Sequence, residues 1–237
     1  MALQVHTFPV GLFQCNCSIV FNDITRDAIV VDPGDEFLEI WERVENLDLK
    51  VHALWHTHAH IDHIGATREL LHALTLRNET LAIAAPRVLL HEGDRWLYEN
   101  INVQAKMLGL NPFEVPPEFE GIKEGNWMVG DMKFQNIHTP GHTPGSCCLS
   151  LNQQVELEGT RAIFAGNQEA KKVIFTGDTL FRRSIGRTDL WGGDSKLILK
   201  SIQSKIMTRD PDTLVIAGHG PITRLEEEAV KNPFLQF

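Results

Sequence analysis

Three histidines and one aspartate lie within six residues of one another, at His58, His60, Asp62 and His63. Packing alone does not readily explain so dense a group of imidazole and carboxylate side chains. Both side chains are common ligands of divalent metals, and zinc is the commonest of these metals. Four such groups exceed what one open catalytic zinc takes from so short a segment. The segment therefore predicts two metals, with the remaining ligands supplied from elsewhere in the chain.

Short apolar runs and turn residues alternate on both sides of this cluster. Helical periodicity predicts helices over 37–47, 62–74 and 196–206, and one or two helices within 86–110. Apolar runs predict strands at 18–21, 28–31, 51–55, 127–129, 134–137, 147–151, 162–164, 173–175 and 214–217. Strands and helices in two similar halves predict an α+β fold in which packed sheets carry outer helices.

Composition limits the class of protein. The chain has 237 residues, of which 43% are hydrophobic, which predicts one large domain over residues 1–237. A formal net charge of -9 argues against nucleic acid as the main partner. The four cysteines form no CxxC pair and are expected to be buried thiols. We find no secretion signal and no apolar run long enough to span a membrane, so we expect a cytoplasmic protein without a membrane partner.

Three glycine-rich loops offer the remaining metal ligands. His142 lies between two Pro-Gly turns, Asp178 follows the apolar run 173–175 in a Gly-Asp-Thr segment, and His219 lies in a Gly-His-Gly segment after the run 214–217. Rigid turns suit a ligand that must hold one rotamer. If the strands lie side by side, these three side chains can converge on the histidine cluster.

The ordered set THxHxDH, TPGHTPG, GDT and GHG resembles the metallo-β-lactamase superfamily. Within that superfamily it is similar to the glyoxalase II-like hydrolases, which hydrolyse hydroxyacylglutathione thioesters. The resemblance runs from Asn16 to the segment 232–235 and covers nearly the whole chain. It implies a four-layer αββα sandwich with the metals at one edge of two sheets. Only 18 residues follow His219, too few for the C-terminal helical domain of glyoxalase II, so we expect a short form.

The resemblance also implies a role for each matching residue. One metal takes His58, His60 and His142, and the second takes Asp62, His63 and His219. Asp178 bridges the two metals together with a water or hydroxide, and Asp32 supports the ligand loop from behind. Proton transfer falls to Asp62, Asp178 or a metal-bound water. The same ligands suit zinc, iron or manganese, with zinc expected first.

Other residues received weaker interpretations. Arg187 either binds an anionic group of the substrate, such as a glutathione carboxylate, or pairs with Asp189. Trp96, Tyr98 and Met107 are spaced as core residues of a helix. His56 and His138 are expected to be structural, and residues 152–170 are expected to form an insertion between two strands.

The leading hypothesis is a binuclear hydrolase of a small-molecule thioester, with S-lactoylglutathione-like compounds as the first candidates. The runner-up is a persulfide dioxygenase with one iron, because the segment 186–189 resembles those enzymes equally well. Gly220 favours the hydrolases, since the dioxygenases typically place an acidic residue after the last histidine. Lactone hydrolysis, nucleic-acid cleavage and a purely structural zinc site are weaker alternatives; the structural site would be closed, four-coordinate and often rich in cysteine.

Overall fold

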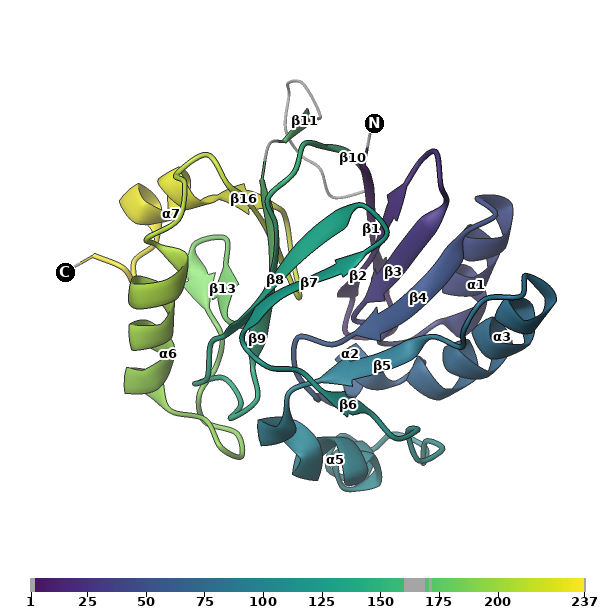
Figure 1. The fold of residues 1–237 in the computed structure, drawn as a ribbon. Helices are drawn as coiled ribbons and strands as arrows, with labels where there is room; N and C mark the ends of the chain where they lie inside the picture. The colour runs from purple at the N-terminus through teal and green to yellow at the C-terminus, as the bar shows by residue number, and fades with distance from the viewer. Residues whose placement is uncertain (1–2, 160–168, 171, 237) are drawn as a thin grey trace.

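Two mixed sheets form the middle of the structure, a computed structural model that describes residues 3–159, 169–170 and 172–236 (Figure 1). The larger sheet has eight strands in the order β11 (Glu169–Ala170), β10 (Val155–Gly159), β1 (Leu3–Val10), β2 (Cys15–Asn22), β3 (Asp27–Val31), β4 (Lys50–Trp55), β5 (Arg87–Leu90) and β6 (Glu120–Gly121). The smaller sheet has six, in the order β16 (Thr223–Arg224), β15 (Leu214–Ala217), β12 (Val173–Gly177), β9 (Cys147–Leu151), β8 (Met132–His138) and β7 (Gly125–Val129). A separate hairpin pairs β13 (Leu180–Phe181) with β14 (Ser184–Ile185).

Helices cover the outer face of each sheet, as Figure 1 shows. The larger sheet carries α1 (Phe37–Asn46) and α3 (Thr67–Thr80), and the smaller sheet carries α6 (Ser195–Ser201), the π-helical turn η2 (Ile202–Ile206) and α7 (Leu225–Lys231). The remaining helices, α2 (Ile61–Ile64), η1 (Glu92–Asp94), α4 (Arg95–Glu99) and α5 (Ile101–Met107), lie along one edge. The predicted αββα sandwich is therefore confirmed.

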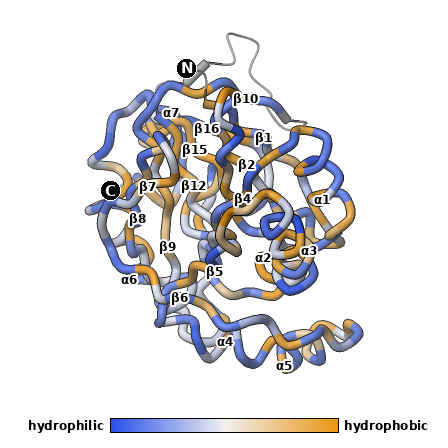
Figure 2. Tube along the Cα trace, turned by 45° about the vertical axis from the view of Figure 1, so that its right-hand side comes forward, coloured by the Kyte–Doolittle hydropathy of each residue, from blue (hydrophilic) through white to orange (hydrophobic). Residues whose placement is uncertain are grey.

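The alternation of side chains along each strand builds this sandwich. In β2, Val20 points into the core between the two sheets, whereas Ile19 and Phe21 point toward α1 and α3. Side chains of a strand alternate between its two faces, so a strand that is apolar on both faces must be covered on both. Figure 2 shows the resulting concentration of hydrophobic residues along the central strands. The extent of the domain, residues 1–237, stays a prediction.

Several elements differ from the sequence prediction. The helix predicted over 62–74 is two helices, because Gly65 approaches the carbonyl of Gly34 too closely for any larger residue and Ala66 N–H bonds to the Pro33 carbonyl. Helical spacing groups Leu38 with Trp41 and Val44, but Leu38 is 66% exposed, and the buried face of α1 is formed by Ile40 and Val44.

Two further differences concern the larger sheet. The run 87–90, predicted as helical, is strand β5, which pairs in parallel with β4. A short buried apolar run fits either a helix or a strand by periodicity alone. The expected insertion 152–170 supplies β10 and β11, and β10 pairs in parallel with β1. The strand predicted at 162–164 lies outside the described residues. Among the described helices, none combines the length and the apolar character needed to cross a bilayer.

Candidate metal centre

The seven predicted ligand side chains meet at one end of the two sheets. They are carried by loops that follow strands and by the short helix α2. His58 and His60 follow β4, Asp62 and His63 lie on α2, His142 lies between β8 and β9, Asp178 follows β12, and His219 lies just after β15. Because β12 and β15 are parallel neighbours, their carboxyl ends bring Asp178 and His219 to the same edge.

Three imidazoles form one side of the cluster. His58 Nε2 lies 3.0 Å from His60 Nδ1, and His142 Nε2 lies 2.9 Å from the same His60 nitrogen. These three side chains satisfy the spacing of a metal site, with all ligand atoms within 4.8 Å of one another. Three ring nitrogens directed at one point form the ligand geometry of a divalent ion such as zinc.

Two acids and two further imidazoles form the other side. Asp62 Oδ2 lies 3.1 Å from His219 Nε2 and 3.8 Å from His63 Nε2. Asp62, His63 and His219 also satisfy the spacing of a metal site. Asp178 stands between the two groups: its Oδ1 lies 3.4 Å from His63 Nε2, and its Oδ2 lies 3.6 Å from His142 Nε2.

Two buried atoms at the centre test whether a cation fits. His63 Nε2 and Asp178 Oδ1 are buried, and neither has a hydrogen-bond partner within the described part of the chain. Buried polar atoms almost always have a partner, and leaving one without is costly. The two atoms face each other across a cluster of nitrogen and oxygen donors, so a cation coordinated there would satisfy both.

The outer ring nitrogens hold four of the five histidines in place. His142 Nδ1–H donates to the Arg187 carbonyl at 2.8 Å, and His219 Nδ1–H donates to the Phe13 carbonyl at 3.0 Å. His58 Nδ1 bonds to Thr57 Oγ1 at 3.0 Å, and His63 Nδ1 bonds to Asp32 Oδ2 at 2.9 Å. A ring that donates from Nδ1 can present the lone pair of Nε2 to a metal.

Asp32 lies behind the ligand loop, where the sequence placed it. Its carboxylate accepts hydrogen bonds from the Thr57 amide (2.7 Å), the Thr57 hydroxyl (2.8 Å) and His63 Nδ1 (2.9 Å). Its backbone has a φ of 50°, which is a strained conformation for a residue other than glycine. The surrounding hydrogen bonds hold Asp32 in this conformation and so couple the β3 turn to the ligand loop.

Asp94 is a buried carboxylate that the sequence prediction missed. It accepts hydrogen bonds from the Ala59 amide (3.0 Å), the Thr143 hydroxyl (2.7 Å) and the Gly145 amide (2.6 Å). It therefore joins the loop of His58 and His60 to the loop of His142. Asp94 stands in no recognisable motif, and only the pairing of β5 beside β4 brings it there.

The electrostatics of the cluster separate its two sides. Burial, followed by the neighbouring imidazoles, lowers the pKa of His58 well below its ordinary value and the pKa of His60 to about 4. Burial also opposes the charged form of His63, but the acidic groups around it, those of Cys15, Asp32, Asp62 and Asp178, raise its pKa well above the ordinary value. His58 and His60 are therefore neutral at neutral pH, while His63 holds a proton.

The pKa of the Asp178 carboxyl is shifted in the direction that favours its charged form. Burial by itself would raise the pKa of this carboxyl, but the imidazoles of His63, His142 and His219 outweigh burial and lower it below its usual range. Asp178 is therefore ionised. Gly218 permits this arrangement, because a Cβ at that position would collide with Asp178 Oδ1.

A cavity of about 460 Å³ opens onto the cluster. Trp96 and Met107 line it and are 45% and 77% exposed, so their predicted place in the core is wrong, whereas Tyr98 is buried as predicted. Arg187 also lines the cavity. Its Nε and Nη2 atoms donate hydrogen bonds to the Asp189 carboxylate at 2.7 and 2.8 Å. Of the two alternatives for Arg187, the structure therefore shows the salt bridge.

The predicted structural histidines have ordinary partners. His56 is buried and bonds to the Leu89 carbonyl and the Thr67 hydroxyl, and burial lowers its pKa to about 4. His138 bonds to the Pro144 carbonyl and stacks on His91. Neither belongs to the groups of side chains with metal-site spacing among the described residues.

The fold and the ligand cluster agree with the family that the sequence matches. The family model of the metallo-beta-lactamase superfamily matches residues 10–154 and 160–219. The chain therefore belongs to this superfamily, and it is a metallo-hydrolase of that class. His/Asp clusters of this kind bind divalent metals in the superfamily.

Individual relatives narrow the comparison. The chain is 34% identical to hydroxyacylglutathione hydrolase GloC of Haemophilus influenzae over 235 residues, which are 98% of each protein. Among solved structures, it is similar to BLEG-1 B3 metallo-beta-lactamase, with a TM-score of 0.76 and 33% identity over 98% of this chain and 99% of that one. It is also similar to TTHA1623 in a di-iron-bound form, with a TM-score of 0.73 and 32% identity over 97% of this chain and 99% of that one.

Proposed function

We propose that this protein is a binuclear metal-dependent thioesterase of the hydroxyacylglutathione hydrolase type. The observation that carries the proposal is a pair of buried atoms, His63 Nε2 and Asp178 Oδ1, that make no hydrogen bond within the described residues and lie at the centre of seven converging side chains. The 34% sequence identity to hydroxyacylglutathione hydrolase GloC, which extends over 98% of this chain, supports a thioester as the substrate. The cavity above the cluster has the size of a small-molecule site.

The proposed ligands follow the two groups in the structure. His58, His60 and His142 would hold one metal, and Asp62, His63 and His219 the other, with the Asp178 carboxylate shared between them. Bound metals supply a Lewis acid for the substrate carbonyl and a water that ionises near neutral pH. We propose zinc as the metal, with iron or manganese as alternatives; the di-iron form of TTHA1623 supports the iron alternative.

Two carboxylates face the cavity and are placed to handle protons. Asp62 and Asp178 both line it, and the surrounding imidazoles outweigh burial and keep the pKa of each carboxyl low. Each is therefore ionised and can accept a proton or a hydrogen bond from a water molecule beside it. In the overall reaction, water adds to the carbonyl carbon, the C–S bond breaks, and the thiolate leaves and takes up a proton.

Elemental analysis followed by an activity assay on the same sample tests the proposal. We expect about two metal ions per chain. We also expect hydrolysis of S-lactoylglutathione that a chelator abolishes and added metal restores. Oxygen consumption with glutathione persulfide, in a sample that holds one iron and does not cleave the thioester, would replace this proposal by the dioxygenase. Hydrolysis of lactones without hydrolysis of thioesters would replace it by a lactonase.

Metal binding to the group formed by Asp62, His63 and His219 should release protons. Around His63 and His219, burial opposes the charged form, but the nearby acidic groups raise both pKa values, so both rings carry a proton below those pKa values. A metal ligand must give up that proton, so we expect about one to two protons per ion bound there. The number falls as the pH rises through the raised pKa values.

Calorimetry in buffers of different ionisation enthalpy measures this release. His58 and His60 serve as the internal control, because their lowered pKa values leave these two rings no proton to lose at neutral pH. Heats of binding that do not depend on the buffer for either ion would contradict the prediction.

A further inference from the structure

The walls of the cavity differ in character from its floor. The floor consists of side chains from the ligand cluster: His60, Asp62, His142 and Asp178. The walls are mainly large apolar side chains from four separate parts of the chain, among them Phe13, Ile61, Trp96, Leu97, Met107 and Trp191. A substrate that reaches the floor must therefore lie against apolar surface.

Much of this apolar wall is exposed. Trp96 on α4 stacks against Trp191, with ring centroids 4.8 Å apart, and Trp191 is 49% exposed. Met107 on α5 is 77% exposed. Large apolar side chains that gather in the open around one site, rather than singly, typically mark a surface that binds something.

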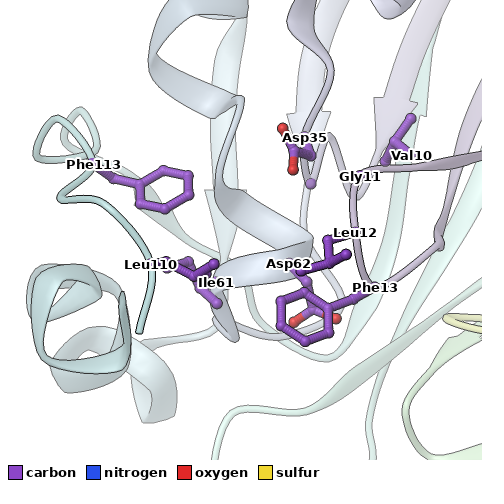
Figure 3. A pocket seen from close by; sticks show the side chains of 10 residues that line it. Val10, Gly11, Leu12, Phe13, Asp35, Ile61, Asp62, Leu110 and Phe113 are labelled. Atoms are coloured by element: carbon purple, nitrogen blue, oxygen red, sulfur yellow. The ribbon is translucent and has the colours of Figure 1, made fainter. Parts of the chain in front are cut away.

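The hairpin between β1 and β2 supplies the facing wall. Figure 3 shows the Phe13 ring beside the Asp62 carboxylate, with Leu12 next to it and Ile61 and Leu110 on the other side. A small cavity of about 60 Å³ lies among these residues and shares Phe13, Ile61 and Asp62 with the larger one. The Phe13 carbonyl also fixes His219, so this wall is held at a set distance from the cluster.

The polar groups of the walls are already engaged. Gln104 bonds to Ile61 N–H through its oxygen and to the carbonyls of Ala59 and Leu97 through its nitrogen. Among the described lining residues, Arg187 is the only arginine or lysine, and Asp189 accepts hydrogen bonds from its Nε and Nη2 and offsets its charge. The walls therefore offer little to the charges of a tripeptide thiol such as glutathione.

We propose that the acyl half of the substrate is bulky and apolar, preferably aromatic, and packs against Trp96, Trp191 and Met107. This inference rests on the proposed thioesterase function and specifies its substrate class. A thioester has two halves, and a charged thiol half gains by staying in water at the mouth of the cavity. The acyl half then takes the apolar wall, which a two-carbon hydroxyalkyl group such as that of lactate would leave largely uncovered.

Two thioesters of the same thiol test the proposal. S-mandeloylglutathione differs from S-lactoylglutathione by a phenyl ring in place of a methyl group. After correction for their rates with hydroxide, we expect kcat/KM to favour the mandeloyl compound roughly tenfold or more, the range for added apolar bulk in an apolar pocket. Replacements Trp191→Ser and Met107→Ser should each lower this ratio several-fold.

A binding measurement separates recognition from catalysis. S-benzylglutathione and S-methylglutathione cannot be hydrolysed, and the affinity of the metal-free protein for each follows from tryptophan fluorescence. We expect the benzyl compound to bind roughly tenfold more tightly, and Met107→Ser to reduce that preference. Val230→Ser is the matched control, because Val230 is 71% exposed on α7 and does not line the cavity.

The outcomes are distinct. Hydrolysis of the lactoyl compound, with ratios that do not change between wild type and variants and equal binding of the two thioethers, overturns this inference and leaves the proposed function standing. Hydrolysis of neither thioester by the metal-loaded protein overturns the proposed function, and the thioether affinities then decide the apolar recognition by themselves. A dimer that Trp191→Ser dissociates, without a change in either ratio, would assign the walls to a second copy of this chain.

Discussion

Replacing Asp178 by alanine should remove at least one of the two proposed metals and nearly all hydrolysis. The carboxylate lies between His63, His142 and His219, at 3.4 to 3.7 Å from their Nε2 atoms. Removing one charged side chain from a buried network of charges costs about 3–5 kcal/mol. At about 1.4 kcal/mol per tenfold, this corresponds to roughly a hundredfold to a few thousandfold in metal affinity.

Metal content and thioester hydrolysis of the purified variant measure this effect together. Asp131→Ala is the control, because Asp131 is an exposed aspartate at the turn between β7 and β8 and belongs to none of the groups with metal-site spacing among the described residues. An Asp178→Ala protein that keeps both metals and full turnover would show that Asp178 is not a shared ligand. The proposed ligand set would then reduce to the three-histidine group and the Asp62-containing group, and Asp62→Ala would test the second group in the same way.

Replacing Asp94 by alanine should loosen both ligand loops at once. Two buried backbone donors, the amides of Ala59 and Gly145, would lose their acceptor. Each such loss costs about 1–3 kcal/mol, so we expect the free energy of unfolding of the metal-free protein to fall by about 2 kcal/mol or more. The metal affinity of the group formed by His58, His60 and His142 should fall about 10–100-fold, as it typically does when a residue that orients metal ligands is replaced.

Denaturant unfolding of the metal-free protein and metal titration of the folded protein report the two effects separately. Glu92→Ala is the control from the same short helix, since Glu92 is exposed and pairs with Arg95 at the surface, where an ion pair contributes about 0–1 kcal/mol. If Asp94→Ala lowers stability but binds metal with unchanged affinity, Asp94 is a purely structural residue.

The convergence of the seven predicted ligand side chains follows in part from short-range features of the sequence. Asp178 and His219, for example, each stand just after an apolar run that forms a strand. The carboxyl ends of neighbouring parallel strands lie at one edge of a sheet, so residues at those ends come together once the strands pair. Local pattern therefore carried information about long-range proximity.

The pattern was less informative where an element is short or lies at the edge of the fold. It placed the run 87–90 in a helix, although pairing with β4 makes it a strand. It also placed Trp96 and Met107 in the core, because helical spacing shows that residues share a face but not whether another element covers that face. In this structure that face is open to the cavity.

The sequence by itself determined the sandwich architecture and the placement of His142, Asp178 and His219 at strand ends and turns, because alternation and turn chemistry are local properties of the chain. Only the tertiary structure decided which side chains surround the cluster. Asp94 joins two loops that are far apart in the chain, and Phe13, Met107 and Trp191 come from three distant segments to form the cavity walls. Contacts between distant segments depend on how the layers pack, and no local pattern in the sequence records them.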